Sequence, residues 1–291
     1  MSDAKRILVT GGAGFIGSHL CEALVQDPQN AVTVLDNYST GTVENHVSGV
    51  RYVRGDTRDI DSLIDFTPDL VFHLGEYSRT SESFKEPEKT WQYNSNGTFH
   101  VLEFCRKNGV KKILYAGSST KLADGGDGRN QSPYAWTKAT NTELFQRYHD
   151  WFGLPFVTVY FYNVYGGREI ENGPYATFIA NMKRMMREKQ PLTIVAPGTQ
   201  HRSFTHVDDI VRGIILAAEK GNGDGYCLGP KEMHTIREVA ELFGGEIVML
   251  PERPGDRKTV AIDLTKTEEA LGWKAAIRLE DHIREFLKTL P

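Results

Sequence analysis

The sequence has few cysteines, no excess of basic residues and no long apolar run. Its three cysteines, Cys21, Cys105 and Cys227, lie far apart along 291 residues, in a number and spacing that suit neither a set of disulfides nor a metal site. Each lies within an apolar pattern that is typical of a buried thiol in a reducing compartment. We therefore predict a cytoplasmic protein with no bound metal.

Charge and hydropathy exclude two classes of partner. A net charge of −4 offers no electrostatic attraction to nucleic acid or to an anionic membrane. No apolar run approaches the roughly 20 residues that cross a bilayer, and residues 1–20 have the pattern of a strand and a turn, not of a signal peptide. With 40% hydrophobic and 25% charged residues, the composition indicates a globular protein of one or two domains.

A strand, a glycine turn and a helix open the sequence. Residues 7–9 form a short apolar run, and from Phe15 onward the apolar positions recur three or four apart, as on one face of a helix. Between them, Gly12-x-Gly14-x-x-Gly17 has the spacing of a dinucleotide-binding turn, where glycine permits positive φ and lets the backbone approach a pyrophosphate. The helix N-terminus would attract the phosphates. The residues expected at the dinucleotide are Gly11, Gly14, Phe15, Ile16 and Gly17.

Asp36 narrows the dinucleotide to NAD. A second apolar run, residues 31–35, ends in Asp36, which follows Gly17 by 19 residues. A carboxylate at this place accepts hydrogen bonds from the adenosine ribose and repels a 2′-phosphate. No arginine follows it directly, so NADP and an NADP-dependent sugar reductase are disfavoured.

Strands and helices alternate through the first half of the chain. After the Asp36 strand we expect strands at 50–54, 70–74, 113–116 and 156–161 and helices at 59–65, 88–108 and 133–152. Such alternation predicts an α/β fold, a Rossmann-type doubly wound parallel sheet covered by helices on both faces. We assign residues 1–162 plus 205–230 to this NAD-binding domain. Residues 163–204 plus 231–291 are predicted to form a smaller mixed α/β lobe for the substrate.

Tyr134 and Lys138 are the predicted catalytic pair. They lie four residues apart and therefore on one face of the expected helix. A free tyrosine has a pKa of about 10 and is a poor base at neutral pH, but an adjacent ammonium and a positive nicotinamide ring favour the phenolate. Ser118, at the end of the preceding strand, adds a hydroxyl. These groups suit removal of a proton from a carbinol while NAD takes the hydride.

At this point the chain resembles the extended short-chain dehydrogenase/reductases, specifically the NAD-dependent nucleotide-sugar epimerases and dehydratases. The resemblance covers nearly the whole length and implies an NAD cofactor and a nucleoside diphosphate sugar as substrate. It rests on the glycine turn, Tyr134-x-x-x-Lys138 and several shorter strings. These strings are Asp36-Asn37, Gly55-Asp56, His73-Leu74-Gly75-Glu76, Asn94-Ser95-Asn96-Gly97-Thr98, Tyr162-Asn163-Val164-Tyr165-Gly166 and Arg253-Pro254-Gly255-Asp256.

The resemblance also implies roles for individual residues. Asn37, Asp56, Leu74 and Asn94, with Tyr134 and Lys138, are expected to hold the cofactor. Substrate contacts are expected from Ser119, Thr120, Asn163, Arg202, Arg253 and Asp256, in which the arginines clamp the diphosphate and the aspartate binds a ribose. The chemistry agrees, because guanidinium groups bind phosphates through paired hydrogen bonds and a carboxylate suits hydroxyls.

The sequence departs from the family around the catalytic serine. Tyr134 follows Ser118 by only 16 positions, a shorter interval than in typical 4-epimerases, so either Ser118 or Ser119 fits the catalytic hydroxyl. Many 4,6-dehydratases carry an acid and a base after this hydroxyl; here Lys121 keeps a basic group. Glu76 replaces a small residue beside the nicotinamide region and is either a second catalytic carboxylate or a hydrogen-bonded structural acid.

Local similarity favours a dehydratase. The strings around Glu76 and Lys121 resemble the GDP-N-acetylglucosamine 4,6-dehydratases of legionaminic-acid gene clusters. We therefore favour an NDP-hexose 4,6-dehydratase in which Lys121 or Glu76 takes the C5 proton of a 4-keto sugar, with an NDP-sugar 4-epimerase as the alternative. A non-catalytic dinucleotide-binding protein is a distant alternative, because the Tyr, Lys and Arg groups are all present. Apolar residues on more than one face of the helices near 88–108 and 133–152 predict a homodimer, as the family implies.

Overall fold

The computed structural model describes residues 4–252 and 262–291. Its centre is a seven-stranded sheet in which every neighbouring pair is parallel. In spatial order the strands are β3 (Arg51–Arg54), β2 (Asn30–Asp36), β1 (Lys5–Thr10), β4 (Leu70–His73), β5 (Lys112–Ser118), β6 (Phe156–Phe161) and β11 (Gly223–Leu228). The predicted Rossmann-type sheet is confirmed.

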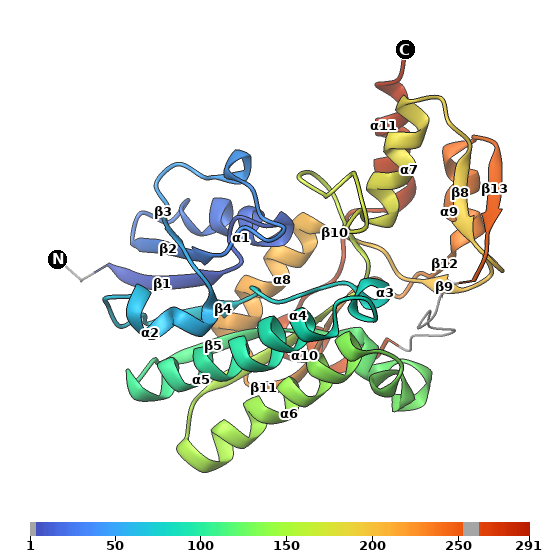
Figure 1. Cartoon of the computed structure of the whole chain (residues 1–291). Coiled ribbons are helices and arrows are strands. Elements are labelled where there is room, and N and C mark those ends of the chain that lie inside the picture. Colours follow the sequence, from blue (N-terminus) through green and yellow to red (C-terminus); the bar gives the residue numbers. More distant parts are fainter. Residues whose placement is uncertain (1–3, 253–261) are drawn as a thin grey trace.

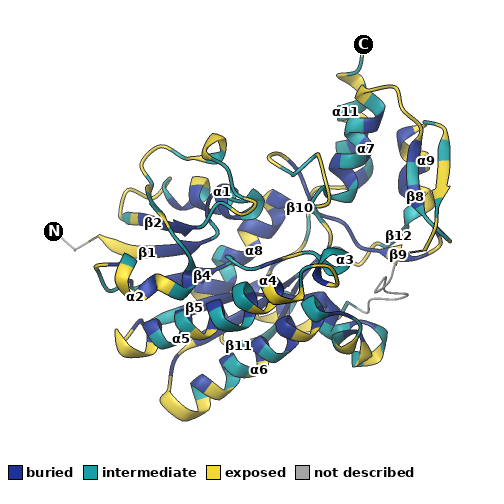
Figure 2. Cartoon of the chain, viewed as in Figure 1, coloured by how far each residue is buried: buried dark blue, intermediate teal, exposed yellow. Residues whose placement is uncertain are grey.

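Helices cover both faces of this sheet (Figure 1). Successive side chains of a strand point to opposite faces. On β1, Ile7 and Val9 pack on the face covered by the helices at 15–24 and 207–220, whereas Leu8 packs on the face covered by the helices at 60–63, 97–107 and 133–152. The helices of this domain are α1 (Phe15–Leu24), α2 (Ile60–Leu63), α3 (Thr80–Ser83), α4 (Pro87–Trp91), α5 (Gly97–Lys107), α6 (Pro133–Phe152), α8 (Val207–Lys220) and α10 (Thr265–Leu271). Figure 2 shows the resulting pattern, with buried strands between helices that are exposed on their outer faces.

A smaller lobe lies beside the sheet domain (Figure 1). Three helices enclose its apolar core, which includes Ile179, Val239 and Ile283. The elements are α7 (Phe178–Arg187), α9 (Ile236–Phe243), α11 (Leu279–Lys288), and the strand pairs β7 (Val164–Tyr165) with β10 (Thr205–His206), β8 (Leu192–Val195) with β13 (Ile247–Leu250), and β9 (His201–Arg202) with β12 (His234–Thr235).

Two predicted helices differ from the structure. The helix expected at 88–108 consists of α4, a π-helical turn at Gln92–Asn96, and α5. Such a turn inserts extra backbone into a helix and is common at functional sites. The helix expected at 59–65 is a 3₁₀ turn, Thr57–Asp59, followed by the single turn of α2.

The C-terminal part of the chain is shared between the two domains. Residues 231–291 were expected in the small lobe, but α10 packs against α8 and β11 of the sheet domain. Trp273, fully buried, lies in the core of the sheet domain, and its Nε1 donates to the carbonyl of Asp209 at 2.9 Å. Among the described residues no helix has the length and apolar character of a membrane span.

Candidate active site

The glycine turn brings two backbone segments closer together than side chains would allow. Gly11, at φ +75°, lies so near the loop after β4 that a Cβ would be 2.8 Å from the Cα of Gly75. A Cβ on Gly17 would lie 2.1 Å from the carbonyl oxygen of Gly11. α1 begins directly after Gly14, so the unpaired N–H groups of its first turn lie at the carboxyl end of β1. This geometry fits a dinucleotide pyrophosphate.

Asp36 is held at the end of β2 by two backbone N–H groups. Its Oδ2 accepts from Ala13 at 2.9 Å, and its Oδ1 accepts from Tyr38 at 2.8 Å. Burial raises the pKa of Asp36 above its ordinary value, while these two hydrogen bonds oppose the shift. Each carboxylate oxygen keeps a further lone pair, so the group can still accept from ribose hydroxyls.

Tyr134 and Ser118 meet at the carboxyl edge of the sheet. Ser132 caps α6 by accepting from Ala135 N at 3.0 Å, and Pro133 occupies the first turn, where its missing N–H costs nothing. This fixes Tyr134 in the first turn, and its hydroxyl donates to Ser118 Oγ at 3.1 Å. Thr120 Oγ1 also lies 2.9 Å from Ser118 Oγ. The structure thus pairs Tyr134 with Ser118.

Lys138 lies one turn further along α6 and contacts Glu76. The Lys138 ammonium donates to Glu76 Oε2 and to the carbonyl of Ala116. The two side chains are 6% and 1% exposed. Burial acts to raise the pKa of Glu76, but the charge of Lys138 lowers it below its ordinary value. Glu76 is therefore a buried carboxylate paired with an ammonium, as in the structural alternative.

A cavity of about 410 Å³ connects these groups. It runs from the glycine turn to the catalytic pair and reaches the small lobe, so most of the residues predicted to form the site border one hollow. The predicted residues that line it are Gly11, Gly14, Phe15, Ile16, Gly17, Asp36, Asn37, Leu74, Glu76, Ser118, Ser119, Thr120, Tyr134, Lys138 and Asn163.

Lys121 does not reach this cavity. Beyond Ser118 the chain enters a 3₁₀ turn, Ser119–Leu122, and the Lys121 ammonium donates to Asp224 at 2.9 Å and to Tyr160 at 3.3 Å. Lys121 instead lines a separate hollow bordered by Thr142 and Asp224. The expectation that Lys121 removes a substrate proton is not supported by this placement.

Other predicted binding residues are also placed outside the cavity lining. Asn94 is fully buried, and its amide binds the backbone of Tyr77 and the hydroxyl of Thr137, so it joins the π-helical turn to its neighbours. Asp56 accepts from Arg58 and Asn37, while its neighbours Gly55 and Thr57 line the cavity.

Arg202, Arg253 and Asp256 were also expected to contact the substrate. Arg202 is 5% exposed on β9 and donates to the carbonyl of His201 at 2.8 Å. Arg253 and Asp256 lie outside the described residues.

The cavity residues that were not predicted from the sequence include Arg79, and Ile170 and Thr177 on the side of the small lobe. Arg79 lines the cavity, its Nε is buried without a hydrogen-bond partner, and burial lowers its pKa. Its position in a loop that follows a sheet strand could have indicated it. Ile170 and Thr177 also line the cavity, but they lie in an irregular segment with no motif.

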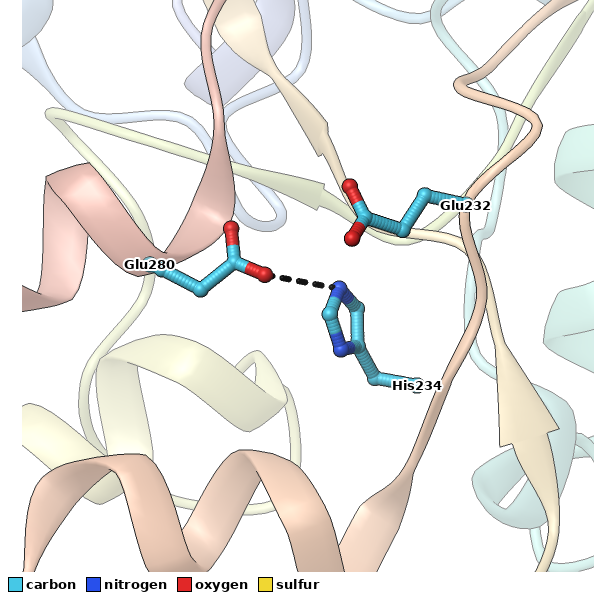
Figure 3. A group of neighbouring side chains, drawn as sticks. All are labelled: Glu232, His234 and Glu280. Carbon is cyan, nitrogen blue, oxygen red and sulfur yellow. Dashed lines mark ion pairs between the residues drawn. The ribbon is translucent and has the colours of Figure 1, made fainter.

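One group of potential metal ligands lies elsewhere in the described part of the chain (Figure 3). The ligand atoms of Glu232, His234 and Glu280 lie within 4.8 Å of one another. Glu232 is exposed, and His234 forms an ion pair with Glu280 at 3.5 Å. None of the three lines the cavity, so this group plays no part in the chemistry argued below.

Comparison with known proteins agrees with the geometry. Residues 7–229 match the model of the NAD dependent epimerase/dehydratase family. UDP-glucuronic acid decarboxylase 6 of Arabidopsis thaliana is 31% identical, over 95% of this chain and 86% of the relative.

Two solved structures share the fold over almost the whole chain. The UDP-glucose 4-epimerase of Thermus thermophilus, in complex with NAD, is 30% identical with a TM-score of 0.88, covering 97% of this chain and 98% of that one. DesIV, a dTDP-glucose 4,6-dehydratase from Streptomyces venezuelae with NAD bound, is 25% identical with a TM-score of 0.86, covering 97% and 96%. With its glycine turn, its Asp36 and its Tyr134–Lys138 pair on this fold, the chain belongs to the NAD-dependent epimerase/dehydratase family.

Proposed function

We propose that the protein is a nucleotide-sugar 4-epimerase that works through a 4-keto-sugar intermediate. The observation that carries the proposal is the contact of Tyr134 with Ser118 in the cavity, together with the engagement of both groups expected to take a C5 proton in ion pairs. Of the two groups expected to serve as that base, Lys121 pairs with Asp224 outside the cavity, and Glu76 lines the cavity but is buried in an ion pair with Lys138. Similarity to a 4-epimerase at 30% identity supports the same reaction.

Tyr134 and Ser118 handle the proton of the sugar. Tyr134, as phenolate, takes the proton of the C4 hydroxyl, and Ser118 Oγ, within hydrogen-bond reach of the phenol, shares it. When the ketone is reduced again, Tyr134 returns the proton to the new hydroxyl. Bound NAD supplies the hydride acceptor and donor at C4.

The remaining residues hold and orient the ligands. Asp36 would accept from the adenosine ribose, and the third N–H of Lys138 would bind the nicotinamide ribose. Asn163 lines the cavity, and its Nδ2 donates to the carbonyl of Ser203 at 2.8 Å. Its amide oxygen would accept from a hydroxyl of the sugar. Arg202 is proposed as a diphosphate contact.

Product analysis tests this proposal against a dehydratase. The purified protein is incubated with UDP-, GDP- and dTDP-hexoses, and the products are examined by mass spectrometry and NMR. A product of unchanged mass with inverted C4 supports the proposal, whereas loss of the mass of one water shows a 4,6-dehydratase. Tyr134→Phe is the control, and its product formation should fall at least 100-fold. Absence of any product from the native protein would refute both reactions.

A further inference from the structure

Glu76 is the most heavily hydrogen-bonded side chain at the cavity, and the reaction proposed above does not use it. Its Oε1 accepts from Thr98 at 2.6 Å, from Asn141 at 2.7 Å and from Tyr115 at 3.2 Å. Its Oε2 accepts from Tyr115 at 3.0 Å and from Lys138. These donors come from α5, α6 and β5, so three elements fix one carboxylate.

The bonds around Glu76 also fix the protons of its neighbours. An ionised carboxylate can only accept, so Thr98 gives its single hydroxyl proton to Glu76 and must accept from His73 Nε2, 2.9 Å away. His73 Nδ1 then accepts from Thr10 Oγ1 at 2.7 Å, and Thr10 accepts from Gly75 N at 3.0 Å. Burial lowers the pKa of His73 to about 4, so near pH 7 the ring is neutral and its Nδ1 is an acceptor.

Two hydrogen bonds fix the orientation of the Lys138 ammonium. An ammonium has three N–H groups; Glu76 and the carbonyl of Ala116 take two of them. One N–H remains for a ligand in the cavity that Lys138 lines. Because the two buried charges have opposite signs, they form a pair with no net charge.

The pair lies among few other titratable groups near Tyr134. Arg79, in the loop after β4, and Tyr115, on β5, interact electrostatically with Tyr134, and His73 faces Glu76 from β4. Tyr115 and His73 are neutral near pH 7 because burial raises the pKa of the first and lowers that of the second. Lys138, Glu76 and Arg79 are charged side chains that line the same cavity as Tyr134.

We propose that Glu76 is a positioning residue: it fixes the Lys138 ammonium with one N–H toward the cavity and offsets its charge, and so sets the pH range in which Tyr134 accepts a proton. This inference rests on the proposed function, in which Tyr134 is the base. If the carboxylate loses its charge, the uncompensated ammonium stabilises the phenolate more strongly. Tyr134 then ionises at lower pH.

The pH profile of Glu76→Gln tests the offset of charge. Single-turnover reduction of bound NAD by the nucleotide sugar is followed by absorbance from pH 5 to 9. In the pH–rate profile of Glu76→Gln, we expect the acidic limb to move to lower pH by about one unit. At a pH on that limb, the rate of the variant, as a fraction of its plateau rate, should then be about tenfold higher than that of the native protein. Glu76→Ala, with room for water around Lys138, carries the same expectation if Glu76→Gln does not fold.

Two control variants separate charge from packing. Thr98→Val removes a hydrogen bond to Glu76 without a change of charge, so it should lower the melting temperature and leave the limb in place. Glu188→Gln removes a carboxylate that pairs with Arg184 on the surface of α7 and should change neither. Superimposable profiles of Glu76→Gln and wild type, or an equal shift in Thr98→Val, would overturn the proposal.

Thermal unfolding tests the pair without a sugar. Lys138→Met leaves Glu76 buried without its cation and should lower the melting temperature by several degrees, whereas the double variant with Glu76→Gln should regain most of that loss. Additive effects of the two substitutions would show that Glu76 does not hold Lys138. Because this cycle needs no substrate, failure of every sugar to reduce NAD counts against the proposed function alone.

Discussion

The two halves of the cavity are built from different kinds of structure. The half around the glycine turn and Asp36 comes from β1, the start of α1 and β2, which are consecutive in the sequence and adjacent in the sheet. The half around Tyr134 combines the end of β5, the loop after β4, and the segment that carries Asn163 and Thr177. The first half is therefore determined by local sequence, and the second depends on how distant segments pack.

The largest effect is expected on NAD binding, when a methyl group is added to the glycine turn in the first half of the cavity. Gly17→Ala places a Cβ 2.1 Å from the carbonyl oxygen of Gly11, so the turn has to open and loses the geometry that fits a pyrophosphate. We expect NAD affinity, measured by isothermal titration calorimetry, to fall more than 100-fold.

Gly167→Ala is the matched control for that substitution. Its Cβ would make ordinary contacts at 3.7 Å with the ring of His19, and it should bind NAD as the native protein does. Equal losses in the two variants would show that the turn has no special need for glycine.

The two lysines test the second half. Lys138→Met should lower kcat about 100-fold, because a donor at the reacting groups is lost, whereas Lys121→Met should change kcat less than threefold because its ammonium pairs with Asp224 outside the cavity. Steady-state kinetics with the substrate found by product analysis measures both. A large loss of kcat in Lys121→Met would indicate that this lysine is a catalytic base. It would then support the 4,6-dehydratase reaction over the 4-epimerase.

The difference between the halves also explains what could be predicted from the sequence. The glycine turn and Asp36 could be predicted because their spacing along two consecutive strands decides their position. The parallel sheet could be predicted from the alternation of elements, since Ile7, Leu8 and Val9 are buried on both faces. Even the start of α6 follows from its local residues, Ser132 and Pro133.

The second half could be predicted only in part. The sequence favoured Ser118 as the catalytic hydroxyl but left Ser119 open, because the contact with Tyr134 depends on how α6 packs against β5. Lys121 was expected as a base at the substrate, and its placement outside the cavity could not be foreseen because its partner, Asp224, lies 103 residues away on β11. The role of Glu76 stayed open for the same reason, since its donors come from elements that only the fold brings together.

A buried histidine joins the two halves and gives the fold a pH dependence. His73 bonds to Thr10 in the first half and, through Thr98, to Glu76 in the second. Burial lowers its pKa from 6.5 to about 4. Between these values the unfolded chain binds more protons than the folded one, so stability decreases as the pH falls from 6.5 to 4. The shift corresponds to about 3 kcal/mol.

Chemical denaturation at several pH values measures this contribution. The free energy of unfolding of the native protein should fall by about 3 kcal/mol more than that of His73→Gln over this range. His201→Gln, at an exposed position on β9, is the control and should follow the native protein. If His73→Gln shows the same slope as the native protein, the histidine is not held neutral by its two hydroxyl partners.

The smallest effect on catalysis is expected from the outer surface of the first domain. On α5 and at the end of α6, the large apolar side chains of Phe99, Trp151 and Phe152 are 46%, 61% and 52% exposed, and exposed aromatic side chains are enriched at interfaces. We propose that these helices pair across a two-fold axis in a homodimer.

Analytical ultracentrifugation at micromolar concentration should then show a dimer, and the double variant Trp151→Ser, Phe152→Ser should shift the protein toward monomer. Because these residues lie at the opposite end of α6 from Tyr134, kcat of the variant should change less than threefold; a native protein that sediments as a monomer would refute the interface.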